Sequence, residues 1–566
     1  MFNWKVIKLT YRRGTLIPLA SSLIAGCFIV LPVLVVLYRS ITTTRLGAYV
    51  GLTAENYLRV LTDPQIGTLL KNSLIYAGGS ATLGTCLGAL LAWIVARTNT
   101  PGKAFVEMMP LYPILMPPIM KNISWILLLS PRSGILNNLL KQYLGIETQI
   151  FNAFSLPGMI WTFGLACVPL GYLFLLPVFL SFDPSLEESA YIAGSKPMST
   201  MLRITFPLAI PAFLSAFVLN ALRGLRGFET PVLQGTPGGI EVFVSKVYDS
   251  MAIEYSPGLA ASYSGVLILL SFITLMIYIR TTRFSERYAT ITGKGYRVKV
   301  IDIGRWKYVA LLVVLSYFLV GIVIPLLVLI ITSIIPYYDY EMFMSFFSHI
   351  DFSNYYRVAH HPSFVSGLYN SLGLSAIIAV VTVLAGIIMA FTIHRTKVYG
   401  SKIFEFIGTI PLSFPALILS LGIVLLLIGT PIYKTLWALG LGLFVAYFPY
   451  AFRNASGAII NIHNELDEAA WVHGARWRHV FFKVTLPLLK PSIAGALFYI
   501  FIEAIRNVDV AVLLTSPGHE YGPVTLFEYF QVGQWAESAA GGVIYLFILI
   551  AAVSIAKFVF KIKFSL

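Results

Sequence analysis

The residues best placed to do work in this chain belong to a short polar segment that occurs twice within an otherwise apolar sequence. The first copy contains Glu188, Ala190 and Gly194, and it runs on to Pro207. The second copy lies 280 positions later and contains Glu468, Ala469, Ala470, Gly474 and Pro487. Polar residues are costly inside a bilayer, so each copy is expected to leave it. The pair therefore indicates a docking device that is presented twice to a soluble partner.

The local sequence of the first copy predicts two short helices joined by a sharp turn. Residues 183–185 read Asp-Pro-Ser, which is typical of a helix start. Glu187 and Glu188 follow in the first turn, where the helix dipole favours negative charge. Gly194 is typical of a helix C-terminal cap. A second helix is expected to follow and to meet the next apolar span at Pro207.

No constellation of catalytic residues accompanies these segments. The chain has no G-x-x-x-x-G-K-[ST] phosphate loop, because Gly293-Lys294-Gly295 fails at the spacing and at the residue after the lysine. An H-E-x-x-H motif, clustered cysteines and a nucleophile elbow are also missing from the sequence. His360 and His361 show no metal-ligand spacing. The sequence predicts a conduit rather than an enzyme, with no metal, no cofactor and no nucleotide site of its own.

The composition is that of a polytopic membrane protein. The chain is 57% hydrophobic and 11% charged, whereas soluble chains carry about 25% charged residues. All three cysteines fall in apolar runs, so no disulfide framework is expected. The net charge of +15 indicates basic loops on one side of a membrane and requires no nucleic acid.

Apolar windows predict about twelve transmembrane helices of about 20 residues each. The first six windows are 15–38, 66–95, 104–130, 155–181, 207–228 and 261–280. The second six are 308–333, 366–393, 403–428, 432–452, 488–512 and 540–560. The windows 104–130 and 488–512 are the weakest, because prolines and charges interrupt them.

The positions of lysine and arginine predict the orientation. Basic residues concentrate in the N-terminal arm, the loop 97–103, the stretch 280–307 and the tail 557–563. Counting spans puts all four on one face, which is cytoplasmic by the positive-inside rule. Both polar segments fall on this face. We therefore expect a multi-pass protein of the bacterial inner membrane, surrounded by lipid, with both termini in the cytoplasm.

The repeat extends well beyond the polar segments. Asn56-Tyr57 returns as Asn354-Tyr355, and Arg97 returns as Arg395, both 298 positions later. The shift falls to 280 before the polar segments, so residues 134–152 are the expected extra material of the first half.

Each half carries an even number of spans, so the two halves are expected to be parallel and to pack about an axis along the membrane normal. The expected organisation is a first half at 1–280 with its polar segment near 183–207, a basic linker at 281–307, and a second half at 308–566 with its segment near 464–487.

Charges inside the spans are candidates for the transport path. Arg226 and Glu229 recur as Arg506 and Asp509, each pair three residues apart and on one helix face. Such pairs could form a gate on the path. They could equally be neutralised pairs at the membrane interface or contacts to a partner. Lys121 could attract an anionic cargo or could extend its amine to the interface.

The polar segments resemble the EAA loop of permease subunits in bacterial ATP-binding-cassette importers. The second copy matches the pattern Glu-Ala-Ala, three residues, Gly and a later Leu-Pro fully, whereas the first has Ser189 and Phe206 in place of Ala and Leu. The resemblance spans nearly the whole chain. It implies an all-α permease of the type I importer fold, built from two tandem parallel repeats of six helices. By this resemblance, Glu188 and Glu468 anchor two ATPase subunits, the glycines supply the turn, and a periplasmic binding protein delivers the cargo.

The cargo is less well defined by the sequence. The runs 55–61, 96–102 and 130–134 look most like those of ferric-iron permeases, so ferric iron is the expected cargo. Permeases of similar design serve 2-aminoethylphosphonate, thiamine, sugar phosphate or polyamine, and these stay open as alternatives. A secondary transporter is the alternative class. It requires acidic residues at the membrane midplane and a charged signature between the second and third spans, where this chain has only the loop 97–103.

Overall fold

The structure is a computed structural model of the 566-residue chain. It describes residues 16–45, 48–182, 184–287, 300–395, 400–463, 465–466, 469–470, 475 and 477–560. The chain divides into two compact units. Unit 1 comprises Met1–Leu61, Val247–Gly265 and Tyr355–Leu566, and unit 2 comprises Thr62–Lys246 and Val266–Asn354.

The expected number of spans is confirmed. Among the described residues, 9 helices are long and apolar enough to cross a membrane, and there are up to 12 if each of 3 bent helix pairs counts as one span. The bent pairs are Phe105–Ile114 with Pro118–Leu129 (92°), Ser401–Ser413 with Ala416–Leu427 (107°) and Val480–Leu488 with Lys490–Ile505 (72°). The first two bends have Pro117 and Pro415 at equivalent positions of the repeat. A proline cannot donate a backbone hydrogen bond, so a helix breaks readily there.

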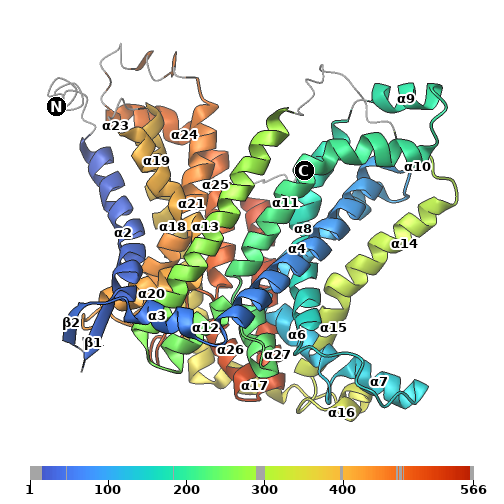
Figure 1. Ribbon diagram of the computed structural model, residues 1–566, viewed down its shortest axis with the longest axis horizontal. Coiled ribbons are helices and arrows are strands. Elements are labelled where there is room, and N and C mark those ends of the chain that lie inside the picture. Colours follow the sequence, from blue (N-terminus) through green and yellow to red (C-terminus); the bar gives the residue numbers. More distant parts are fainter. Residues whose placement is uncertain are drawn as a thin grey trace. The chain divides into compact units, whose positions relative to one another are not determined.

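Unit 2 is built around α4 (Ile66–Arg97), α8 (Leu156–Leu180) and α11 (Phe206–Arg226), which pack side by side (Figure 1). Short helices lie at the two ends of this bundle, with α9 beyond one end and α7 at the other. The further elements of this unit are α5 (Lys103–Met108), η1 (Met109–Leu115), α6 (Pro118–Leu129), α7 (Ile135–Leu144), α9 (Pro184–Ile192), α10 (Pro197–Thr200), η2 (Met201–Thr205), η3 (Pro231–Gly235), η4 (Thr236–Gly238), α14 (Trp306–Phe318), η5 (Leu319–Val323), α15 (Ile324–Ser333), α16 (Tyr340–Met344) and η6 (Phe346–Ser348).

Unit 1 is built around α18 (Pro362–Arg395), α21 (Leu436–Ile460) and α25 (Lys490–Ile505), which also pack together. A two-stranded antiparallel hairpin adds a small β element that the sequence did not predict. The other elements are α2 (Leu16–Ser40), β1 (Thr42–Arg45), β2 (Ala48–Leu52), α3 (Glu55–Thr62), α17 (Ser353–His360), α19 (Ser401–Thr409), η7 (Ile410–Ser413), α20 (Ala416–Leu427), α23 (Trp477–His479), η8 (Val480–Thr485), α24 (Leu486–Leu488), α26 (Gly522–Gln531) and α27 (Trp535–Phe560). Four helices, namely α3, α12 (Phe243–Ala252), α13 (Pro257–Arg287) and α17, have residues in both units.

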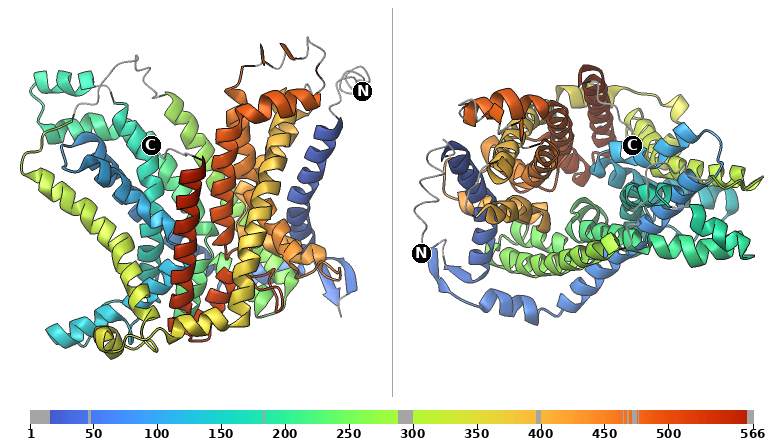
Figure 2. Two further views of the ribbon diagram at one scale, coloured as in Figure 1. Left: turned by 180° about the vertical axis from the view of Figure 1, so that it is seen from behind. Right: turned by 90° about the horizontal axis from the view of Figure 1, so that it is seen from above.

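The first span of each sequence half packs on helices of the other half. In unit 1, α2 packs against α18 and α20, so closely that a Cβ on Gly422 would lie 2.2 Å from the Pro32 carbonyl oxygen. In unit 2, the continuous span α14–η5–α15 packs against η1 and α6 (Figure 2). The compact units are therefore defined by contacts between helices, whereas the predicted halves are defined by the repeat in the sequence.

Equivalent asparagines tie these first spans to the short helices that follow them. In unit 1, Asn56 donates from its side-chain amide to the carbonyl oxygens of Ser40 and Thr42, at 3.3 and 3.1 Å. In unit 2, Asn354 donates to the carbonyl oxygens of Ser333 and Ile335, at 3.1 and 2.6 Å. The last carbonyls of a helix have no partner within it. The repeated asparagine therefore caps the end of the span that precedes it.

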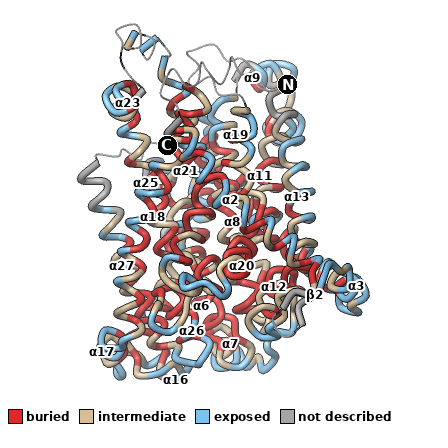
Figure 3. Tube along the Cα trace, turned by 90° about the vertical axis from the view of Figure 1, so that its left-hand side faces the viewer, coloured by how far each residue is buried: buried red, intermediate tan, exposed pale blue. Residues whose placement is uncertain are grey.

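Burial follows the pattern of a lipid-embedded bundle. Buried residues run along the middle of the spans, while exposed residues gather on short helices such as α3 and α17 (Figure 3). Large apolar side chains such as Leu34 of α2 and Leu312 of α14 are also exposed. An apolar surface of this kind is stable when lipid covers it.

Glycines set the close approach of α4 and α8 in unit 2. A Cβ on Gly84 would lie 2.3 Å from the Cys167 Cβ and 2.8 Å from the Gly164 carbonyl oxygen. A Cβ on Gly88, one turn later, would lie 2.6 Å from the Tyr172 backbone nitrogen. Small residues commonly line such contacts between membrane helices because they let the backbones approach.

We expect Gly84→Ala to lower the thermal stability of the purified chain in detergent. The added methyl group would overlap backbone atoms of α8, and overpacking of this kind costs about 1–3 kcal/mol. Gly78→Ala on the same helix is the matched control, because a Cβ there meets nothing within 4 Å. The control should gain stability from the better helix former, by about 0.5–1 kcal/mol. Equal melting temperatures for the two variants would contradict the packing described above.

Candidate functional site

The first polar segment forms helix α9, which ends in a glycine turn. The Ser195 amide donates to the Ala190 carbonyl oxygen at 2.9 Å, and Gly194 has φ +82°. This hydrogen bond across a left-handed residue is the one that closes many helix C-termini. Glycine suits the position because other residues are strained at this φ. The predicted turn residue thus stands at the turn.

The surface of α9 is unusually apolar for a short polar segment. Ile192 is 87% exposed and Leu186 is 42% exposed. Glu188 is exposed on the same helix, and Ala190 is half-buried. Exposed apolar side chains beside an exposed carboxylate are typical of a surface that a partner covers.

The second polar segment repeats the turn as far as the structure describes it. The Ala475 amide donates to the Ala470 carbonyl oxygen at 3.0 Å, which is the bond of the first copy shifted by 280 positions. Ala469 is exposed and helical. Glu468 and Gly474 lie outside the described residues.

In both copies the chain then enters a π-helix immediately before the predicted proline. In unit 2, η2 ends at Thr205, two residues before Pro207, and the helix continues without a break into α11. In unit 1, η8 ends at Thr485, two residues before Pro487. A proline ring clashes with the carbonyl four residues earlier, and the wider π-turn accommodates this clash. The expected helix after the turn is present, but in unit 2 Pro207 lies inside a continuous helix rather than at a junction.

A buried ion pair that the sequence did not predict holds α9 in unit 2. Glu187, the neighbour of Glu188, pairs through Oε2 with Nη2 of Arg97, the last residue of α4. The Arg97 side chain is fully buried and the Glu187 side chain is 10% exposed. The Thr205 hydroxyl donates to the other carboxylate oxygen, Glu187 Oε1, at 2.8 Å. The signal was in the sequence, because arginine, acid and threonine recur as Arg395, Asp467 and Thr485.

In unit 1, Arg395 ends α18 as Arg97 ends α4. It donates from Nη2 to the carbonyl oxygens of Ile459 and Ile462, at 2.9 and 2.6 Å. The first of these carbonyls lies in the last turn of α21, the span that precedes the second polar segment, and the other lies two residues after its end. Asp467, the counterpart of Glu187, lies outside the described residues.

The charges at the end of α25 include an ion pair that was not among the expected ones. Arg506 follows α25 and pairs with Glu503 three residues before it, and Tyr447 donates to the Glu503 carbonyl oxygen at 2.8 Å. The position equivalent to Glu503 in the first half is Arg223, so the first half cannot repeat this pair. Asp509 stands half-buried after Arg506.

The remaining candidates of the path belong to unit 2. Arg226 is the last residue of α11, and Glu229 follows it; both are half-buried. The chain then continues through η3, whose five residues are all buried. Lys121 lies half-buried on α6, just after the bend of its span.

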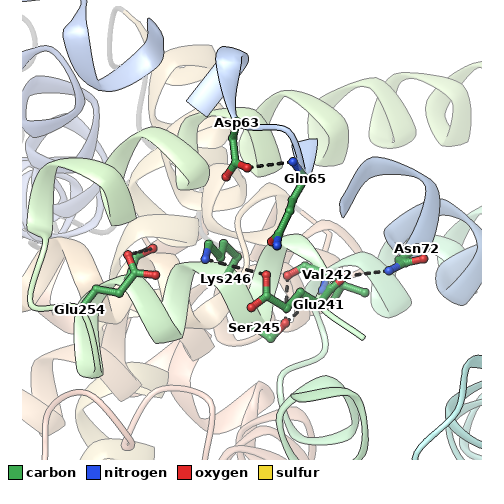
Figure 4. Close-up of polar contacts among 9 residues, drawn as sticks. Asp63, Gln65, Asn72, Glu241, Val242, Ser245, Lys246 and Glu254 are labelled. Carbon is green, nitrogen blue, oxygen red and sulfur yellow. Dashed lines mark hydrogen bonds and ion pairs between the residues drawn. The ribbon is translucent and has the colours of Figure 1, made fainter. Parts of the chain in front are cut away.

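At the other end of unit 2, polar side chains join α4 to the segment before α12 (Figure 4). Asn72 donates to the Glu241 carbonyl oxygen at 3.2 Å, and the Glu241 side chain lies 3.8 Å from Lys246 Nζ. The hydroxyl of Ser73 accepts from the Phe243 amide at 3.0 Å.

Unit 1 repeats these bonds with the equivalent Asn-Ser pair. Asn370 donates to the Glu520 carbonyl oxygen at 2.9 Å, and Ser371 accepts from the Gly522 amide at 2.9 Å. Partial burial of Glu520 works against ionisation, but hydrogen bonds from the Gly518 amide and the Ser366 hydroxyl lower its pKa overall. The repeated Asn-Ser pair thus holds its helix, α4 or α18, to the chain segment at the start of α12 or α26.

Among the described residues, no group of three or more His, Cys, Asp or Glu side chains is arranged to hold a metal ion. The arrangement comprises a short helix with exposed apolar side chains, a buried ion pair that holds this helix, and charged residues at the ends of two spans.

Comparison with known proteins identifies the family. The model of the binding-protein-dependent transport system inner membrane component matches residues 84–283 and again residues 382–562. The ferric transport system permease protein FbpB of Actinobacillus pleuropneumoniae is 24% identical over 88% of this chain and 72% of its own length. The trehalose/maltose transport system permease protein MalF of Thermococcus litoralis is 27% identical over 50% of this chain and 99% of its own length. Nearly the whole of this MalF permease therefore aligns with half of the present chain.

Among solved structures, a bacterial ABC transporter that imports the acidic polysaccharide alginate aligns with 51% of this chain at 20% identity, with a TM-score of 0.41. The two family matches together cover more than half of the chain and, with the 9 to 12 spans among the described residues, confirm the predicted fold class of two tandem repeats of membrane helices. The chain is a membrane subunit of a transporter rather than an enzyme, as predicted. It belongs to the binding-protein-dependent transport system inner membrane component family, as an ABC importer permease that carries two copies of the family domain.

Proposed function

We propose that this chain forms the path of an ATP-driven importer in which α9 and the repeated segment near 464–487 each receive one copy of an ATPase. The observation that carries the proposal is the exposed apolar surface of α9, where Ile192 is 87% exposed beside the exposed Glu188. A helix of nine residues is too small to be a domain, but its shape suits a groove on a partner.

The source of the energy follows from the whole sequence. The chain has no phosphate-binding loop, so ATP must be bound and hydrolysed by separate subunits. In this scheme Glu188 and Glu468 anchor the ATPases, and Gly194 and Gly474 supply the turns. The small side chains of Ala190, Ala469 and Ala470 belong to the same docking surfaces.

The proposed topology follows the basic loops. The halves at 1–280 and 308–566, joined by the linker 281–307, have both termini and both docking segments in the cytoplasm. The periplasmic binding protein then meets the opposite face, and lipid covers the exposed apolar side chains of the outer spans.

Charges at the ends of two spans are the proposed gate of the path. Arg226 with Glu229 and Arg506 with Asp509 lie at the C-terminal ends of α11 and α25, the spans that each docking segment leads into. The pairing of Arg506 with Glu503 supports an electrostatic role, because a charge buried in this region requires a partner. Lys121, on the bent third span, is the proposed cation of the same path.

Ferric iron is the proposed cargo. The support is the similarity over most of the chain to ferric transport permeases, including the putative FbpB 1 of Haemophilus influenzae, which is 24% identical over 90% of this chain. The binding protein selects the cargo in such systems, so the permease need not display metal ligands.

We expect Glu188→Lys and Glu468→Lys each to reduce ATP-dependent uptake at least about tenfold, because a positive charge replaces the carboxylate that pairs with the ATPase. Uptake by cells that express each variant, at matched membrane levels, measures the effect. Glu147→Gln is the control, since Glu147 is exposed in the loop after α7. Uptake at the level of the unaltered chain in both lysine variants would refute the assigned docking role.

We expect Gly194→Val to impair uptake more than Gly194→Asn. The position has φ +82°, which costs a β-branched residue about 1–2 kcal/mol or more, whereas asparagine tolerates it. A Cβ at Gly194 meets nothing within 4 Å, so any loss reflects backbone strain rather than a clash. Uptake assays on the two variants at equal expression test this expectation. Equal activities would show that uptake does not depend on the left-handed turn at Gly194.

We expect deletion of the gene to abolish high-affinity uptake of radiolabelled ferric iron and to leave uptake of thiamine and 2-aminoethylphosphonate unchanged. Complementation with the intact gene should restore iron uptake. Loss of thiamine or phosphonate uptake instead would assign the importer to that cargo and leave its ATP-driven mechanism in place.

A further inference from the structure

We propose that the buried ion pair of Arg97 and Glu187, called the latch below, transmits movement of α9 to span α4. The end of the linker between the halves binds the residues directly after Arg97 and stabilises the same contact. This inference rests on the proposed function, because it takes α9 to be the helix that the ATPase moves. It concerns residues behind the docking surface rather than on it.

The first step is the burial of the pair. Arg97 is fully buried at the end of α4, and its guanidinium pairs with the Glu187 carboxylate on the first turn of α9. Removing one partner of a buried ion pair leaves an uncompensated charge, which is strongly unfavourable. The two helices are therefore bound to move together.

The second step is the other oxygen of the same carboxylate. Glu187 Oε1 accepts from the buried hydroxyl of Thr205, at the end of η2 and the start of α11. One carboxylate thus joins α4, α9 and α11. Displacement of α9 acts on both spans at the same point.

The third step is the linker, which docks on the residues directly after the pair. The Ile301 amide donates to the Arg97 carbonyl oxygen at 2.8 Å, and the Asn99 amide donates to the Ile301 carbonyl oxygen at 3.2 Å. The Asn99 side chain donates to Asp302 Oδ1 at 2.5 Å and accepts from the Ile303 amide at 3.2 Å. The linker then leads into α14, which packs in the same unit.

The linker contact follows from the order of the chain. The linker follows the first half and precedes α14, so its end at Ile301 lies in unit 2 together with Arg97. Arg97, Glu187 and Thr205 are positioning residues that act through α9.

The test uses the assembled transporter, purified with the ATPase that copurifies with the chain and reconstituted in proteoliposomes with its binding protein and radiolabelled ferric iron. The readout is cargo moved per ATP hydrolysed, alongside the amount of ATPase that copurifies. Glu187→Gln and Arg97→Ala should lower this ratio at least about tenfold while ATPase still copurifies. Thr205→Val, which removes one hydrogen bond, should lower it by about two- to tenfold, and Asp302→Ala should also lower it. Glu147→Gln and Arg132→Ala, both exposed near α7, are the matched charge controls.

A transport ratio unchanged by Glu187→Gln and Arg97→Ala in folded chains would overturn the latch. If those two chains are lost from the membrane, Thr205→Val and Asp302→Ala decide in their place, and an unchanged ratio in both overturns it equally. Transport by the unaltered complex without ATP would instead overturn the proposed function. The two failures are thus distinguishable.

Discussion

A polar side chain buried at the end of a membrane span must find its partner inside the protein, and this constraint organises both halves of the chain. Asn56 and Asn354 cap the carbonyls at the ends of the first spans, and Asn72 and Asn370 hold the segments before α12 and α26. Arg97 carries a full charge at the end of α4 and finds its partner in the buried carboxylate of Glu187. The repeated short motifs are therefore the places where the spans are held to their neighbours, and α9 is held at one of them through Arg97.

The positions of the spans could be predicted because the length of an apolar window is a property of the sequence alone. The window 66–95 became α4 at Ile66–Arg97, and the window 155–181 became α8 at Leu156–Leu180. The neighbours of each span could not be predicted. The window 15–38 became α2, which packs on α18 and α20 of the other half, and nothing in its composition identifies those partners. The hairpin β1–β2 was missed for a related reason, since its antiparallel pairing joins two strands of only 4 and 5 residues.

In the first polar segment, likewise, the sequence does not show which of two adjacent residues contacts the rest of the protein. Glu187 and Glu188 are adjacent carboxylates in one helical turn, and the sequence predicts both in the first turn of a helix without distinguishing them. Neighbours in a helix point about 100° apart, so one can face the protein while the other faces outward. Which one faces inward is decided by Arg97, ninety positions earlier in the chain. The recurrence of arginine, acid and threonine at matched positions was the available signal, and only spatial proximity turns it into a contact.

The prolines show that the same motif can stand in a continuous helix in one half and in a bent helix in the other. Pro207 and Pro211 in the first half correspond to Pro487 and Pro491 in the second. The first pair lies within a single span from Met201 to Arg226, whereas the second pair flanks a break of 72° at Leu489. Since the prolines are the same, they permit a bend without imposing one, and the surroundings must decide it. In unit 2 these surroundings include Thr205, held by the carboxylate of Glu187 at the start of α11. The side chain that fixes α9 therefore also supports the straight course of the helix that follows it.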